Sequence, residues 1–168
     1  MGAPGNGRLT MSIKPPLTDS LGRVHSNLRM SVTDRCNIRC FYCMPEENVE
    51  FKPRSEILSF EELIRFARIT AAMGVHRIRL TGGEPLVRND LPALVGQLKQ
   101  VEGITDVALT TNAVLLADQA ESLKDAGLDR INISLDTLND DTFFSLIPPT
   151  RNRKSNSRHL CRSGRRYP

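Results

Sequence analysis

The sequence predicts an α/β fold in which parallel strands alternate with helices. Four short apolar stretches have the length and composition of strands, and each is followed by a segment with apolar residues at helical spacing. Successive strands begin about 25 to 45 residues apart, a separation that suits right-handed βα crossovers in a parallel sheet. Polar residues gather where each strand is expected to end. Because parallel strands all end at one edge of a sheet, that edge is the expected place for a functional site.

The first unit begins with the strand-like residues 28–33 and continues into a long loop. Its helix is expected to begin after Ser59, because Glu62 stands three residues later and completes a capping box. Gly74 is expected to end this helix, since glycine adopts the left-handed conformation of a C-terminal cap without strain.

The other units repeat this order. Asp90 is expected to cap the second helix, with Pro92 tolerated in its first turn, and Gly127 is expected to end the third. The expected elements are strand 75–81, helix 91–101, strand 104–111, helix 116–127, strand 128–135 and a helix over 139–147.

Cys36, Cys40 and Cys43 hold three of the chain's four thiols within eight residues, in the loop after the first strand. An odd number of clustered thiols argues against a disulfide and favours a metal. Structural zinc requires four ligands. An iron–sulfur cluster held by three cysteines keeps one iron open, and an open position indicates chemistry rather than a structural role. For zinc, the candidate fourth ligands are His25, His76 and Cys161.

The second strand is followed directly by Thr-Gly-Gly-Glu-Pro at residues 81–85. This loop is neither a dinucleotide fingerprint nor a phosphate loop. Glu84 would repel an anion and suits a ligand that carries an ammonium group. The two glycines allow a close approach of the backbone, and Pro85 fixes the direction in which the chain leaves the loop.

Together these motifs resemble the radical S-adenosylmethionine (SAM) enzymes. The C-x3-C-x2-C spacing, with Tyr42 before the last cysteine, matches the hallmark of that superfamily, and a Gly-Gly-Glu-Pro loop follows its second strand. The flanking residues resemble more narrowly the GTP 3′,8-cyclase family of molybdenum-cofactor biosynthesis, from about Leu28 to Leu138. The stretches that carry this resemblance are 28–45, 78–91, 109–116 and 126–138.

The resemblance implies a fold and a reaction. The fold would be the N-terminal portion of a partial TIM-type barrel, incomplete after about four βα units. One [4Fe-4S] cluster would bind SAM, and reductive cleavage of SAM would give a 5′-deoxyadenosyl radical. That radical would start the cyclisation of GTP to 3′,8-cyclo-7,8-dihydro-GTP. An external one-electron reductant and a downstream cyclic pyranopterin synthase would be partners, and a homodimer stays open for full-length members.

The resemblance also implies roles for individual residues. In this sequence the cluster ligands would be Cys36, Cys40 and Cys43. The SAM contacts would be Tyr42, Gly82, Gly83, Glu84 and Ser134. The GTP contacts would be Arg29, Arg79 and Thr110.

The sequence also departs from the cyclase family. We expect three segments: a flexible arm at 1–27, a truncated radical SAM core at 28–147, and a basic, disordered tail at 148–168 that is unrelated to the family. Beyond the first three cysteines only Cys161 remains, so the family's second, C-terminal cluster is expected to be absent. The chain alone is therefore expected to be inactive.

Charge and hydropathy exclude some classes of protein. The net charge is +4, and residues 148–168 alone contribute +7, so residues 1–147 carry −3 and a nucleic-acid partner is not expected. No apolar run has the roughly 18 residues of a membrane span, and we expect a cytoplasmic protein. Two alternatives stay open: a radical SAM enzyme acting on a peptide or small metabolite, and a non-enzymatic metal-binding remnant with a nucleic-acid-binding tail.

Overall fold

The computed structural model describes residues 16–44 and 49–146. Its strands are β1 (Asn27–Ser31), β2 (Arg77–Thr81), β3 (Asp106–Thr111) and β4 (Arg130–Ile133). Its α-helices are α1 (Phe60–Ala71), α2 (Leu91–Lys99), α3 (Leu116–Asp125) and α4 (Asp140–Leu146), and its short 3-10 helices are η1 (Arg54–Glu56) and η2 (Pro85–Val87). No helix in these ranges is long and apolar enough to cross a membrane.

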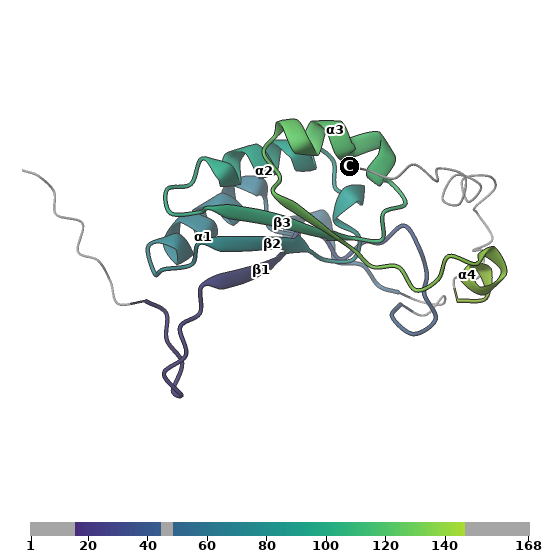
Figure 1. Cartoon of the computed structure of the whole chain (residues 1–168), viewed down its shortest axis with the longest axis horizontal. Coiled ribbons are helices and arrows are strands. Elements are labelled where there is room, and N and C mark those ends of the chain that lie inside the picture. Colours follow the sequence, from purple (N-terminus) through teal and green to yellow (C-terminus); the bar gives the residue numbers. More distant parts are fainter. Residues whose placement is uncertain (1–15, 45–48, 147–168) are drawn as a thin grey trace, which may run out of the picture.

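The four strands form one parallel sheet in the order β1-β2-β3-β4. This confirms the predicted α/β fold with alternating strands and helices. Figure 1 shows α1, α2 and α3 gathered on one face of the sheet, whereas α4 lies apart, beyond the ends of the strands. The other face of the sheet is not covered by any helix within the described residues.

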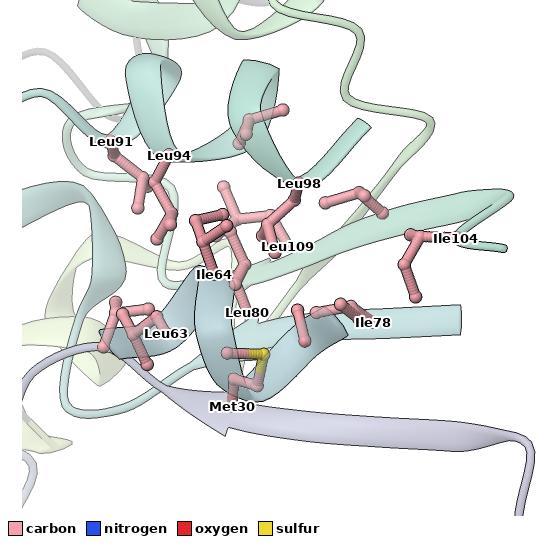
Figure 2. Packing of buried hydrophobic residues seen from close by; sticks show 14 of the residues in the cluster. Met30, Leu63, Ile64, Ile78, Leu80, Leu91, Leu94, Leu98, Ile104 and Leu109 are labelled. Atoms are coloured by element: carbon pink, nitrogen blue, oxygen red, sulfur yellow. The ribbon is translucent and has the colours of Figure 1, made fainter. Parts of the chain in front are cut away.

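The apolar core lies between the sheet and its three helices. Alternate strand residues point toward the helices because side chains alternate across a strand. Met30 is the register partner of Leu80, and Leu80 is the register partner of Leu109. All three are almost completely buried. Figure 2 shows them packed against leucines of α1 and α2. Burial of each such side chain contributes roughly 1.5 to 3 kcal/mol, so this layer fixes the positions of the strand ends.

The ends of α1 confirm the predicted signals. The Ser59 hydroxyl accepts a hydrogen bond from the Glu62 amide, and the Glu62 carboxylate accepts one from the Ser59 amide. Gly74 has a φ of +94°, the left-handed conformation expected of the residue that follows a helix. Gly127, after α3, has a φ of +90° and has the same role.

The predicted cap at Asp90 is wrong in its chemistry. Asp90 does precede α2, but its side chain makes no capping hydrogen bond. Its φ is 59°, in the left-handed region, whereas a side-chain cap needs extended backbone. Pro92 lacks an N–H group, and the Ala93 amide donates instead to the Asp90 carbonyl at 2.9 Å. The backbone therefore supplies the cap.

The strands are shorter than predicted at their edges. The fourth strand ends at Ile133 rather than at residue 135, and its apolar residues are exposed, with Ile131 at 39% and Ile133 at 53%. Residues 16–26, within the expected arm, form a turn in which Thr18 and Val24 pair and the Leu17 amide donates to the Met73 carbonyl. The expected tail at 148–168 lies outside the described residues.

Candidate functional site

The predicted site residues gather at the edge of the sheet where β1, β2 and β3 end. The cysteine loop (residues 36–43) follows β1, and the glycine loop (residues 81–85) follows β2. Asn112 is the first residue after β3. Parallel pairing brings these three segments together, as the sequence predicted.

The glycine loop packs directly against the segment that leads into the cysteine loop. The Gly83 amide donates to the Thr33 carbonyl at 2.8 Å, and the Glu84 amide donates to the Arg35 carbonyl at 2.8 Å. A Cβ atom on Gly82 would lie 2.3 Å from the Thr33 carbonyl oxygen, and one on Gly83 would lie 2.3 Å from that of Arg35. Only glycine fits at these two positions, so the close approach predicted for them is an approach to the neighbouring loop.

The Glu84 carboxylate joins the glycine loop to the end of β3. It is 1% exposed and accepts three hydrogen bonds: from the Leu86 amide at 3.0 Å, the Thr111 hydroxyl at 2.7 Å and the Asn112 amide at 2.7 Å. These donors compensate for the burial of a charged group. A carboxylate has about four acceptor positions, and three of those of Glu84 have donors among the described residues. Contact of the fourth with an ammonium group stays a prediction.

Asn112 carries this contact on to the first cysteine. Its side-chain amide donates to the Asn37 side-chain oxygen at 2.8 Å and lies 3.8 Å from the Cys36 sulfur. Its side-chain oxygen accepts from the Val114 amide at 3.0 Å, which fixes the orientation of the amide. Glu84, Asn112 and Cys36 thus form a connected series, which we call the Glu84 network. Sequence reasoning placed Asn112 among the polar residues at the strand ends and expected it, with Asp136, to orient the site.

The three cysteines are free thiols in different surroundings. Cys36 and Cys40 are partly buried, and Cys43 is exposed. Burial raises the pKa of Cys36 above the usual range of a thiol. Burial also raises the pKa of Cys40, and the neighbouring Cys36 and Cys43 add to this effect. The described residues contain no group of three or more metal-ligating side chains gathered around one point.

The donors nevertheless fit an iron–sulfur cluster in their chemistry. Three thiols on one loop are the ligands that iron–sulfur clusters take. The side-chain nitrogen of Asn37, next to Cys36, is buried and has no hydrogen-bond partner among the described residues. A buried unpaired donor beside a sulfur ligand indicates room for a further acceptor at this place.

The two histidines considered as a fourth zinc ligand lie far from the cysteine loop. His25 and His76 precede β1 and β2, at the opposite end of the sheet from the cysteine loop. A strand of five residues separates the two ends by about 16 Å. His25 instead lies beside Asp19 at 3.3 Å, and His76 beside the Gly74 carbonyl at 3.4 Å. The remaining candidate, Cys161, lies outside the described residues.

Tyr42 connects the cysteine loop to the residues after β4. Its hydroxyl donates a hydrogen bond to the Asp136 carboxylate, and that bond, chiefly, raises the pKa of the phenol. Ser134 is held nearby, where its amide donates to the Thr111 carbonyl at 2.9 Å. The predicted SAM residues therefore come from the segments that follow β1, β2 and β4, but their contact with SAM stays a prediction.

The predicted GTP residues lie on the uncovered face of the sheet. Arg29 and Arg79 are register partners on β1 and β2 and line one cavity of about 230 Å³. Thr110 is on the same face of β3, and its hydroxyl is buried with no partner among the described residues. It does not line that cavity. Sequence reasoning missed Arg77 and Arg130, which also line the cavity; strand periodicity would have placed both on this face.

Comparisons with protein-family models and with curated proteins agree on the family. The Radical SAM superfamily profile matches residues 30–165. A GTP 3′,8-cyclase of Rhodopirellula baltica is 53% identical over 131 residues, covering 77% of this chain and 36% of that protein. One of Acidothermus cellulolyticus is 57% identical over 135 residues, covering 78% and 37%. One of Listeria monocytogenes is 50% identical over 130 residues, covering 77% and 39%.

Solved structures show the same fold at lower identity. Streptococcus suis SuiB bound to S-adenosylmethionine is 24% identical, with a TM-score of 0.56, covering 73% of this chain and 26% of that one. BtrN in complex with AdoMet and 2-DOIA is 20% identical, with a TM-score of 0.50, covering 66% and 46%. These likenesses show the fold alone. The chain spans 36 to 39% of the length of the curated relatives named above.

Proposed function

The chain belongs to the radical SAM superfamily, and from this premise we propose that it is part of a GTP 3′,8-cyclase. Identities of 50 to 57% to three cyclases over more than three quarters of the chain support the substrate class. The observation that carries the proposal is the meeting of the cysteine loop, the glycine loop and Asn112 at one sheet edge through the buried Glu84 carboxylate.

We assign the cluster to Cys36, Cys40 and Cys43. Three ligands from one loop leave one iron open for a small external ligand. When bound there, a [4Fe-4S] cluster together with SAM would supply a carbon radical able to abstract hydrogen from the substrate. The Glu84 network orients the cysteine loop, because the Asn112 side chain contacts the Cys36 sulfur. The second cluster of the family has no ligands among the residues assigned here.

We assign the SAM site to residues at the same edge: Tyr42, Gly82, Gly83, Glu84 and Ser134. The remaining acceptor position of Glu84 would receive the ammonium group of SAM. The Gly-Gly backbone and the residues after β4 flank this point. The protein's contribution is to orient SAM and to keep water away from it.

We assign the substrate GTP to the uncovered face, with its phosphates on Arg29 and Arg79 and a contact to Thr110. A guanidinium group matches phosphate oxygens with two parallel hydrogen bonds. Like charges on directly paired strands repel each other, and neither Arg29 nor Arg79 has a carboxylate partner within the described residues. A bound anion would relieve this repulsion.

The reaction would need partners beyond this chain. We propose an external one-electron reductant, a cyclic pyranopterin synthase that takes the product, and a cytoplasmic setting in which the thiols stay reduced. We also propose the arm at 1–27, the truncated core at 28–147 and the basic tail at 148–168 as the organisation of the chain. Because the chain spans little more than a third of its relatives, we expect it to bind cofactors without completing the cyclisation alone.

Anaerobic reconstitution with iron and sulfide tests the proposal. The chain is expected to bind about four irons, and its EPR spectrum after reduction is expected to change when SAM is added. Cys40→Ser is expected to abolish the brown chromophore. Stoichiometric zinc in place of iron, or a cluster whose spectrum ignores SAM, would contradict the proposal.

A further inference from the structure

The uncovered face of the sheet carries a straight row of residues across all four strands. Arg29 pairs with Arg79, Arg79 with Ala108, and Ala108 with Arg130. Their neighbours along the strands are the buried residues that face the helices, so the row itself points away from the helices. The row therefore contains three guanidinium groups and, between Arg79 and Arg130, the small and buried side chain of Ala108.

A second row, two residues earlier along each strand, supplies the charges that flank the first. Arg77 pairs with Asp106 on the neighbouring strand, and both line the same cavity of about 230 Å³. The lining thus includes four arginines and a single acid, and a cavity with this excess of positive charge suits an anion. The lining residues that matter for charge are Arg29, Arg77, Arg79, Arg130 and Asp106.

The one acid is already engaged with the outermost arginine. A guanidinium nitrogen of Arg130 lies 2.8 Å from an Asp106 carboxylate oxygen, and this bond, chiefly, raises the pKa of Arg130. Arg130 is nevertheless 53% exposed at its side chain, so its other donors are accessible to a ligand. In the free protein Asp106 thus holds Arg130 over the cavity and partly neutralises it.

The separation of Arg130 from the other two arginines of the row favours a long anion. Neighbouring strands lie about 4.8 Å apart, so the backbones of Arg79 and Arg130 stand about 10 Å apart across Ala108. A single phosphate held between Arg29 and Arg79 lies more than two strand spacings from the backbone of Arg130. A chain of several phosphates spans that distance, and it would compete with Asp106 for the Arg130 guanidinium group.

We propose that Arg130, positioned by Asp106, is a specificity-determining residue that lets this face bind a chain of three phosphates in preference to one. The proposal rests on the proposed function, because it places the triphosphate of the nucleotide on Arg29 and Arg79 and extends the site to β4. Asp106 keeps Arg130 oriented. A ligand must compete with Asp106 for the Arg130 guanidinium group, and a single phosphate makes too few contacts to do so.

Isothermal titration of the 168-residue chain with inorganic triphosphate and with inorganic phosphate tests the proposal at one fixed ionic strength. Arg130→Gln is expected to weaken triphosphate binding about tenfold and to change phosphate binding less than about twofold. Ala108→Leu, which adds bulk between Arg79 and Arg130 without changing charge, is expected to have the same selective effect. Arg65→Gln, on an exposed position of α1, is the control for the loss of one positive charge.

A double-mutant cycle separates the proposed role from a structural one. Asp106→Asn keeps an oxygen that accepts from Arg130 but removes the negative charge from the cavity, so it is expected to tighten triphosphate binding several-fold in the wild-type background and by a smaller factor once Arg130→Gln is present. Circular dichroism identifies any variant that fails to fold, and Arg130→Lys, which keeps the charge, is expected to recover part of the affinity.

The outcomes are distinguishable. If Arg29→Gln and Arg79→Gln weaken triphosphate binding but Arg130→Gln and Ala108→Leu do not, the inference is wrong and the proposed GTP site stands. If Arg29→Gln and Arg79→Gln have no effect either, the assignment of the phosphates to this face fails. Equal weakening of phosphate and triphosphate by Arg130→Gln would also overturn the inference.

Discussion

Two loops at the same sheet edge differ in how they are held. The glycine loop is fixed by the protein itself: Glu84 is buried, its carboxylate accepts three hydrogen bonds, and the backbone of the loop docks on residues 33–35. The cysteine loop is held by side-chain contacts that are more exposed: the Asn112 side-chain amide donates to Asn37 and lies 3.8 Å from the Cys36 sulfur, the Tyr42 hydroxyl donates to Asp136, and the loop ends in the exposed Cys43. The glycine loop is therefore ordered in the free protein. The cysteine loop carries thiols that a bound metal would bring together.

This difference fits the chemistry expected of each loop. A site that must orient a cofactor needs a rigid frame beneath it, because a small misplacement of the reacting atoms is costly. Ligands to a metal can be ordered by the metal, whose binding free energy also contributes to folding. We therefore expect substitutions in the glycine loop to affect folding of the free chain, and substitutions in the cysteine loop to affect only metal binding.

The largest expected effect is at Glu84. Glu84→Ala removes the acceptor of the Thr111 hydroxyl and the Asn112 amide and leaves a small cavity, so the free energy of unfolding is expected to fall by about 4 kcal/mol. Urea denaturation followed by circular dichroism measures it. Glu102→Ala, at an exposed position, is the control and is expected to change stability by less than about 0.5 kcal/mol. Equal effects at the two positions would contradict the account.

Gly83→Ala is expected to follow, at about 3 kcal/mol of destabilisation. The new Cβ would lie 2.3 Å from the Arg35 carbonyl oxygen, so one of the two loops must move. Gly96→Ala, within helix α2, is a matched control, because its Cβ would be 3.9 Å from the nearest heavy atom, the Ala126 carbonyl oxygen. That control is expected to stabilise the chain by up to about 1 kcal/mol. A destabilised control and a stable Gly83→Ala chain would reverse the comparison.

Cys40→Ser is expected to separate folding from metal binding. Without iron the variant is expected to unfold within about 0.5 kcal/mol of the wild-type chain, because a hydroxyl replaces a thiol of similar size at a partly exposed site. Iron content after reconstitution is expected to fall to background. If the variant instead fails to fold without iron, the cysteine loop is part of the frame.

The smallest expected effect is at Asn112. Asn112→Asp keeps the side-chain oxygen that accepts from the Val114 amide but replaces the donor that faces the Cys36 sulfur with a charged oxygen. In the reconstituted chain the reduction potential of the cluster is expected to become more negative, as a lost hydrogen bond and an added charge both disfavour reduction. Asn89→Asp, which adds the same charge at an exposed position, is the control. An unchanged potential would limit Asn112 to a structural role.

The parts of the fold that could be predicted depend on local sequence patterns. The capping box of Ser59, the glycine ends of α1 and α3 and the alternation of strands all follow from signals within a few residues. The side-chain cap predicted at Asp90 was wrong, because Asp90 has a left-handed backbone that its residue type does not determine. The predicted length of β4 failed as well, because an edge strand has a partner on only one side.

The site divides in the same way. The cysteine spacing and the glycine loop are local motifs and could be found from the sequence. Two of the three partners of Glu84 are 27 and 28 residues away, and only the sheet register brings them together. Arg130 and Asp106 lie on a predictable face, yet their contact spans 24 residues and needs the register of β3 with β4.

Hydrogen–deuterium exchange of the 168-residue chain, before and after anaerobic iron–sulfide reconstitution, tests the comparison most directly. We predict slow exchange of the Gly83, Glu84 and Asn112 amides in both states, and exchange at Cys43 and Met44 that becomes slow only after reconstitution. Slow exchange throughout residues 36–44 before iron is added would contradict the claim that the metal orders this loop. Fast exchange at Asn112 before iron is added would contradict the claim that Glu84 prepares the support.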